Sequence, residues 1–178
     1  MRASRAERLF RPLGSAFGSA QNAPTMNAAI ADQPFRIDTA RLFDLPAIRR
    51  LERVCFSKDA YDLLTLLGIM LNPAMLRLKA VARGALIGFV AGERRPGASH
   101  GWIITIGVLP EYWGQGIGRA LLLAAEQEMK VARVKLTVRR SNTRAIGLYT
   151  RCGYRWVTTS RGYYYDGEDG LIMEKEVW

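Results

Sequence analysis

The stretch that most constrains the fold of this chain runs from Ile103 to Leu123. It begins as an apolar run, continues through Pro110, and then spaces three glycines two residues apart, at Gly114, Gly116 and Gly118. Proline has no N–H to donate to a strand ladder, and glycine adopts the positive φ angles that tight turns need. The stretch therefore predicts a buried strand, a glycine turn and a helix that begins at about Gly116.

A turn of this kind suits an anion. The first turn of a helix leaves backbone N–H groups without intrahelical acceptors at the positive end of the helix dipole, so a phosphate or pyrophosphate fits there. The pattern differs from a Walker loop, because no Lys-Ser/Thr pair follows Gly118, and it matches a dinucleotide-binding motif poorly. The alternative interpretation is a tight strand-to-helix turn that holds no ligand.

Composition limits the class of protein. The 178 residues are enough for one domain with a substantial core, since 49% of them are hydrophobic. No apolar run reaches membrane-spanning length. Cys55 and Cys152 lie in apolar helical contexts without the spacing of a metal site, which favours reduced thiols and a cytoplasmic location. The chain has a single histidine, so we expect no metal.

The charge balance favours polyanionic partners. Lys and Arg number 26 against 16 Asp and Glu, which gives a net charge of +10. Such a surface suits CoA, an acidic peptide or a ribosomal surface. The sequence lacks a basic strand interleaved with aromatics and a helix-turn-helix pattern, so nucleic acid is not expected as the primary ligand.

The chain divides into a tail and a domain. Residues 1–33 are rich in Arg, Ala, Ser and Gly without apolar periodicity, which predicts a disordered basic tail. Two alternatives stay open, an organelle transit peptide and a translation start at Met26. Residues 34–178 are predicted to form one domain.

Hydrophobic periodicity predicts the order β-α-α-β-β-β-α-β-α-β-β, and hence a mixed α/β sheet in which the central strand has a parallel neighbour. Asp44 is expected to cap the first helix, Arg83-Gly84 to turn a hairpin, and His100 to lie in a loop. The predicted strands are 35–40, 76–82, 85–94, 103–109, 134–138, 154–160 and 171–177. The predicted helices follow residue 44 and cover 63–71, 116–129 and 142–152.

Three motifs together resemble the GNAT family of N-acetyltransferases. They are V-x-P-x-Y before the glycine turn, R-A-L-L after it, and SNTRAIGLYTRCGY further on. The resemblance covers roughly residues 35–178. It implies a mostly antiparallel seven-stranded sheet with about four helices, in which the central parallel pair splays apart and acetyl-CoA lies in the gap. The segments VRRSNTRAIGLYTRCGY and GYYYDGEDGLIMEKEV are most similar to the ribosomal-protein alanine N-acetyltransferases and archaeal N-terminal acetyltransferases.

The resemblance also implies site residues. The backbone at the end of the central strand would pair with the pantetheine arm, and the turn would hold the pyrophosphate. Asn142 and Tyr149 are seven residues apart, so both project from one helix face. The family uses the Asn to bind the CoA arm and the Tyr as general acid toward the departing thiolate. The implied cofactor-binding residues are Ile106, Gly107, Val108, Gly114, Gln115, Gly116, Ile117, Gly118, Arg119 and Asn142.

Two positions depart from the family pattern. Trp113 stands where Arg or Gln is usual, which alters the side-chain support of the glycine turn. The pyrophosphate would still be bound by backbone amides of the turn. Thr137 stands where the bacterial enzymes have a Glu base, and threonine cannot act as a base near neutral pH. Either Glu111 or Asp59 serves through water, or the amine arrives already neutral.

The acceptor implied by the resemblance is the N-terminal α-amine of a protein. Tyr163, Tyr164 and Tyr165 would help to line its slot, although they could equally be aromatics at a strand edge. The predicted activity is direct acetyl transfer from acetyl-CoA through a ternary complex, by a monomer or homodimer. The alternatives are transfer to a small amine or lysine side chain, and a CoA-binding module without turnover.

Overall fold

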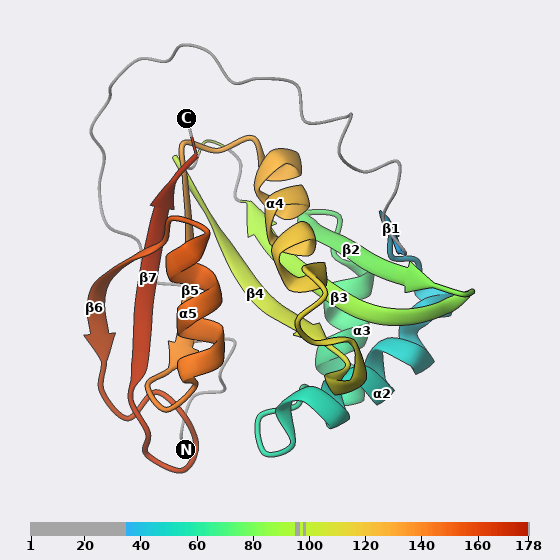
Figure 1. Ribbon diagram of the computed structural model, residues 1–178, viewed down its shortest axis with the longest axis horizontal. Helices are drawn as coiled ribbons and strands as arrows, with labels where there is room; N and C mark the ends of the chain where they lie inside the picture. The colour runs from blue at the N-terminus through green and yellow to red at the C-terminus, as the bar shows by residue number, and fades with distance from the viewer. Residues whose placement is uncertain (1–34, 95–96, 98, 178) are drawn as a thin grey trace.

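The computed structural model describes residues 35–94, 97 and 99–177, so the predicted tail, residues 1–33, lies outside the described residues. Seven strands form one mixed sheet in the order β1-β2-β3-β4-β5-β7-β6 (Figure 1). The strands are β1 (Arg36–Thr39), β2 (Met75–Ala82), β3 (Ala85–Arg94), β4 (His100–Val108), β5 (Arg133–Arg139), β6 (Arg155–Ser160) and β7 (Gly170–Glu176). The helices are α2 (Leu45–Phe56), α3 (Leu63–Leu71), α4 (Ile117–Met129) and α5 (Thr143–Arg151), with 3-10 helices η1 (Leu42–Asp44) and η2 (Pro110–Tyr112).

The predicted element order and fold class are confirmed, and so is the splay of the central parallel pair. Strand β4 pairs with β3 almost from end to end, but its parallel pairing with β5 stops after four residue pairs, at Ile103 and Leu136. Strand β4 then continues to Val108 and β5 to Arg139, and the two separate toward the bottom of Figure 1. Beyond the four pairs, each strand has a ladder partner on one side only.

Helices cover both faces of the sheet. Helix α4 packs against β2, β3 and β4, whereas α2 packs against the opposite face of β3 and β4, with α3 beside it. Along β3 the side chains alternate between the two cores: Val90 faces α4, while Phe89 and Ala91 face α2. Helix α5 lies on the same face as α4 (Figure 1).

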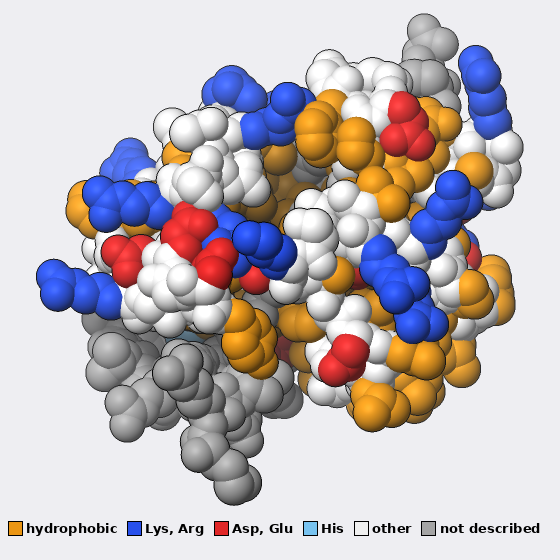
Figure 2. Space-filling view, turned by 90° about the horizontal axis from the view of Figure 1, so that it is seen from below, with side chains coloured by type: hydrophobic (Ala, Val, Ile, Leu, Met, Phe, Trp, Pro, Cys, Tyr) orange, Lys and Arg blue, Asp and Glu red, His pale blue; other side chains and the backbone are white. Residues whose placement is uncertain are grey.

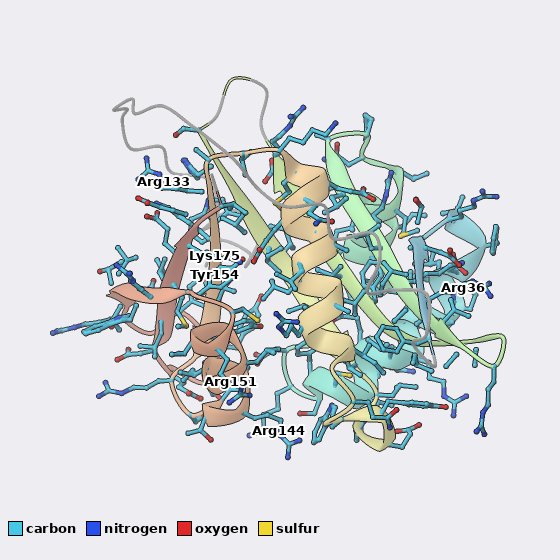
Figure 3. All side chains as sticks on the ribbon, turned by 45° about the horizontal axis from the view of Figure 1, so that its top comes forward. Arg36, Arg133, Arg144, Arg151, Tyr154 and Lys175 are labelled. Atoms are coloured by element: carbon cyan, nitrogen blue, oxygen red, sulfur yellow. The ribbon has the colours of Figure 1, made fainter. Side chains whose placement is uncertain are left out.

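A buried ion pair joins α4 to β7. Glu126 is 2% exposed, and its Oε2 accepts a hydrogen bond of 2.5 Å from Lys175 Nζ. Tyr154 lies beside Lys175 (Figure 3), with its ring centroid 5.9 Å from the ammonium nitrogen. In the part of the chain that the structure describes, neither Glu126 Oε1 nor Tyr154 Oη has a hydrogen-bond partner. The charge of Glu126 is therefore compensated through one oxygen, by Lys175.

Two local predictions need correction. Asp44 is the residue before α2, but its carboxylate accepts from Arg41 N at 2.7 Å and pairs with Lys79 Nζ at 2.7 Å instead of capping α2. The reason is that η1 runs directly into α2, so Asp44 is itself helical (φ −80°, ψ −10°) and its side chain reaches back to the start of η1. His100 is the first residue of β4 and not part of a loop.

Both cysteines carry free thiols, as predicted. Among the described residues, no helix is long and apolar enough to cross a membrane.

Candidate active site

The glycine turn has the predicted conformation. Gly114 and Gly116 have φ angles of +79° and +78°, and a Cβ added at either position would meet nothing within 4 Å. Helix α4 starts at Ile117, and the first intrahelical bond runs from Ala120 N to Gly116 O, at 2.9 Å. The N–H groups of the first turn of α4 therefore have no acceptor within the helix, and the space beside Gly114 and Gly116 is open. This arrangement suits a phosphate.

Gly118 serves a different purpose. A Cβ there would lie 3.2 Å from Leu148 Cδ2, so the missing side chain lets the start of α4 approach α5 closely. The two helices lie on either side of the place where β4 and β5 separate (Figure 1). Gly118 thus brings α5 close to the glycine turn.

The end of β4 is only partly free for a ligand. The Val108 carbonyl accepts from Trp113 Nε1 at 2.8 Å and from Cys55 Sγ at 3.2 Å. The Val108 carbonyl therefore already has two internal donors, and the pairing of Ile106, Gly107 and Val108 with the pantetheine arm stays a prediction. Gly107 has its own packing role, because a Cβ there would come within 2.9 Å of Leu51 Cδ2 on α2.

Helix α5 carries the predicted acid. Tyr149 is buried, with 7% of its surface exposed, and its ring centroid is 6.0 Å from that of Tyr154. Desolvation raises the pKa of Tyr149 well above its usual range, with a smaller contribution from the adjacent Cys152. The phenol is therefore protonated throughout the neutral range, as a proton donor must be.

Asn142 caps α5. Its Oδ1 accepts from Ala145 N at 3.0 Å, a bond typical of an N-cap residue. The cap uses the side-chain oxygen, so the amide NH2 group remains as a donor. The role of Asn142 toward the CoA arm stays a prediction.

On the opposite face of the sheet, Arg139 at the end of β5 joins three segments. Its guanidinium forms two bonds to Asp59 in the α2–α3 connection, of 2.5 and 2.9 Å, and further bonds to Asp166 and Glu168 in the β6–β7 loop. Its Cζ also lies 4.0 Å from the ring centroid of Tyr164. These bonds raise the pKa of Arg139, and the bond to Arg139 is the largest cause of a lowered pKa at Asp166.

Sequence analysis did not identify Arg139 as a site residue. The motif V-R-R-S-N contains two adjacent arginines, and only the fold shows which of them meets the acids of D-G-E-D. The pairing also disfavours Asp59 as the general base, because both of its oxygens accept from Arg139. Glu111, the other candidate, is exposed on η2.

Glu52 on α2 is a second residue that sequence analysis missed. It is 1% exposed, and its Oε1 accepts from Thr105 Oγ1 at 2.6 Å while Oε2 accepts from Tyr61 N at 3.3 Å. Burial, and then the charge of Glu52, raise the pKa of the neighbouring Cys55 to about 11. The thiol is therefore protonated and donates to the strand backbone. The sequence did contain a signal for Glu52, because its helical spacing from Ile48 and Cys55 places it on the same buried face of α2.

The three tyrosines of the β6–β7 loop lie in different environments. Tyr164 is buried beneath Arg139. The Tyr163 ring packs edge-on against the Tyr164 ring, with 5.0 Å between the centroids. Tyr165 is 74% exposed. Thr137 occupies the same face of β5 as Arg139 and packs on Gly170, where an added Cβ would lie 2.7 Å from its methyl group. Thr137 therefore fills space beside the tyrosines.

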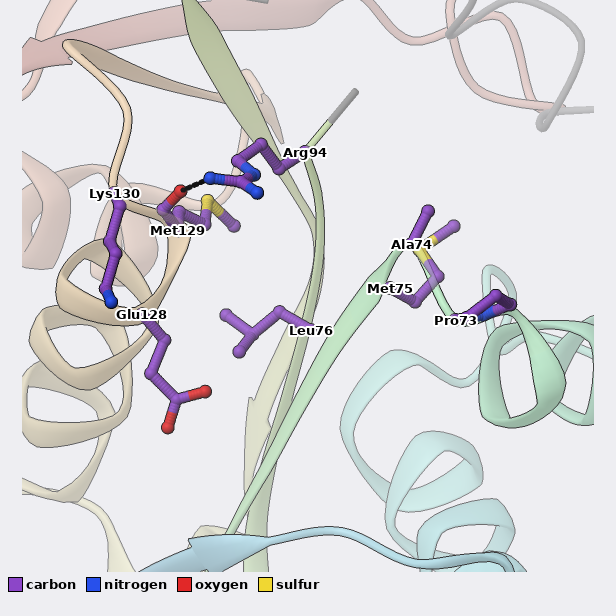
Figure 4. A pocket seen from close by; sticks show the side chains of 8 residues that line it. All are labelled: Pro73, Ala74, Met75, Leu76, Arg94, Glu128, Met129 and Lys130. Atoms are coloured by element: carbon purple, nitrogen blue, oxygen red, sulfur yellow. Dashed lines mark hydrogen bonds between the residues drawn. The ribbon is translucent and has the colours of Figure 1, made fainter. Parts of the chain in front are cut away.

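The surface at the end where β4 and β5 separate is hollowed between two lobes (Figure 2). Acidic side chains gather on the lobe that carries β5 to β7, and Lys and Arg side chains stand on both lobes. A separate pocket of about 480 Å³ lies at the far end of α4, between Met129, Leu76 and Arg94 (Figure 4). None of the predicted site residues lines that pocket.

Comparison with known proteins agrees with this geometry. The family model described as "Acetyltransferase (GNAT) family" matches residues 45–154. An N-alpha-acetyltransferase of Sulfurisphaera tokodaii is 31% identical over 153 residues, which are 78% of this chain and 91% of the relative. The crystal structure of the ribosomal-protein-S18-alanine N-acetyltransferase from Escherichia coli superposes with a TM-score of 0.73 and 30% identity, over 80% of this chain and 94% of that one.

The chain therefore belongs to the GNAT family. Within that family it is an acetyl-CoA-dependent N-acetyltransferase.

Proposed function

We propose that this enzyme transfers the acetyl group of acetyl-CoA directly to the N-terminal α-amine of a protein. The observation that carries the proposal is the loss of pairing between β4 and β5 after Ile103, beside the glycine turn and the helix that bears Tyr149. An acyl donor that lies along the unpaired edge of β4 would have its phosphates at the turn and its thioester near α5. The acceptor would approach from the face that carries Arg139.

The proposed reaction is a direct attack of the amine on the thioester. The neutral amine attacks the thioester carbonyl, the C–N bond forms, and the C–S bond breaks as the amine loses its proton to water. Tyr149 donates its proton to the departing thiolate, and water returns the proton released by the amine to the phenolate. An α-amino group has a pKa near 8, so a useful fraction is already neutral at physiological pH, whereas a lysine amine near 10.4 is almost fully protonated. Because this enzyme has Thr137 and no base at that position, the difference in pKa favours a protein N-terminus over a lysine side chain as the acceptor.

The relatives support the same class of acceptor, because their names specify N-alpha-acetylation and a ribosomal-protein alanine. The Arg139 cluster supports it structurally, because it fixes the β6–β7 loop and its tyrosines beside the end of β5. A ribosomal protein is one candidate acceptor. A monomeric or homodimeric enzyme in the cytoplasm remains our expectation.

The turn can be tested with Gly116→Val. A β-branched residue is strained at φ +78°, so the variant should distort the turn and weaken CoA binding about tenfold or more in calorimetry. Gly84→Val is the matched control, because Gly84 has the same φ of +78° but lies in the β2–β3 hairpin. Equal CoA affinities for the two variants would contradict a role for the turn.

The acceptor can be tested with Thr137→Ala and a pH profile. We expect this variant to keep most of its activity on peptides with a free N-terminus, because Thr137 packs on Gly170 and does not transfer a proton. The value of kcat/KM should rise with pH up to the α-amino pKa near 8 and then level off. A further inflection well below pH 7 would instead indicate a carboxylate base. Preference for lysine side chains or small amines over N-termini would overturn the proposed acceptor.

A further inference from the structure

A cation–π contact connects the segment that follows β4 with helix α5, which follows β5. Trp113, just before the glycine turn on the β4 side, has its ring centroid 4.0 Å from the guanidinium carbon of Arg144 on α5. In Figure 3 the Arg144 side chain lies between α5 and the segment that leads into α4. The contact therefore lies beside the turn that we propose for the donor's phosphates.

A hydrogen bond to the end of β4 orients the Trp113 ring. Its indole Nε1 donates to the Val108 carbonyl at 2.8 Å, which fixes the ring against the end of β4, while 44% of the residue's surface remains exposed. Arg144 is one helical turn before Leu148, the side chain that packs beside Gly118. Positions i and i+4 share a helix face, so Arg144 and Leu148 both face the start of α4.

The guanidinium is available to an anion. Arg144 is exposed, and no carboxylate among the described residues forms an ion pair with it, in contrast to Arg139 with its three carboxylates. A guanidinium that stacks through its face keeps its in-plane N–H groups, and those groups bind phosphate oxygens well. Arg144 and the backbone N–H groups of α4 could therefore bind one phosphate from two sides.

We propose that Trp113 positions Arg144 as a phosphate ligand of the acyl donor, so that α5 binds the donor's phosphate across the gap from the glycine turn. This inference rests on the proposed function, because it takes CoA as the donor. The chemistry is that of a phosphate ester or diphosphate, and CoA offers both, as its 5′-diphosphate and its 3′-phosphate.

The test measures binding of CoA, dephospho-CoA and pantetheine by calorimetry at low and at high salt. Arg144→Gln should weaken CoA binding about 10- to 100-fold at low salt, and less at high salt, because a charge-assisted hydrogen bond is lost. Pantetheine binding should not change. A loss that persists with dephospho-CoA assigns Arg144 to the diphosphate, and a loss that disappears assigns it to the 3′-phosphate.

Trp113→Ala should weaken CoA binding to a similar degree, and the double variant should bind no more weakly than the worse single variant, because the two residues act as a unit. Trp113→Phe, which keeps an aromatic face, should recover part of the affinity. Arg151→Gln is the matched control, since it removes the same charge from the last turn of α5.

Unchanged CoA affinity in Arg144→Gln would overturn the inference, and so would an equal loss of pantetheine binding, which would mean that the pair only maintains the shape of the site. Absence of CoA binding by the wild-type protein would be a different result, because it would overturn the proposed function as well. Thermal unfolding of each variant checks that the affinity changes come from a folded protein.

Discussion

Tyr149→Phe should lower turnover about 10²- to 10⁴-fold while CoA affinity stays close to wild type, because the variant loses a proton donor but keeps the buried ring. Steady-state kcat and calorimetric CoA binding, measured on one preparation, separate the two effects. Burial raises the pKa of the Tyr149 phenol, so the wild-type enzyme should show no alkaline loss of kcat below about pH 10, the usual value for tyrosine.

Tyr154→Phe is the matched control for this experiment. It removes a neighbouring buried hydroxyl that has no hydrogen-bond partner within the described part of the chain. We expect its turnover to stay within about threefold of wild type, since no reacting group loses a partner. Near-normal turnover in Tyr149→Phe would reduce Tyr149 to a packing residue.

Lys175→Met should destabilise the protein by about 3 to 5 kcal/mol, because it leaves Glu126 on α4 as a buried carboxylate without its cation. The change would appear as a lower midpoint of urea unfolding with little change in slope. The Glu126→Leu, Lys175→Met double variant removes both charges and should recover much of the loss.

Lys135→Met provides the comparison for that prediction. Lys135 also pairs with a glutamate, Glu174, at 3.0 Å, but that pair is more exposed. Its loss should cost at most about 1 kcal/mol, as for surface ion pairs. Equal losses in Lys135→Met and Lys175→Met would show that burial of Glu126 does not set the energy of its pair.

The sequence predicts most of the fold because its local signals are strong. The apolar run before Pro110, the glycine spacing and the Arg83-Gly84 hairpin turn each define backbone geometry within a few residues, and all three are confirmed. Asp44 was misassigned because its partner, Lys79, is 35 residues away on β2. An N-cap pattern cannot show that the Asp44 carboxylate accepts hydrogen bonds from the start of a preceding 3-10 helix and from a distant lysine.

The candidate site likewise has parts with local sequence signals and parts that depend on contacts between distant residues. The turn and the α5 motif are contiguous in sequence, so the places of Gly116 and Tyr149 could be predicted. The Arg139 cluster is assembled from Asp59, the end of β5 and the β6–β7 loop, which only the strand order brings together. The bonds of Arg139 to Asp59 and Asp166 span 80 and 27 residues, and residue pairs so far apart leave no periodic signal in one sequence.

The four-pair ladder between β4 and β5 has a topological consequence. An open sheet normally has two edges, but this one gains two more inside it, along β4 after Ile103 and along β5 after Leu136. Exposed edges invite other chains to add a strand, and proteins usually block them. Here the two internal edges flank the place where β4 and β5 separate (Figure 1). A ligand as extended as a strand would therefore pair with the free edge of β4 from inside the sheet.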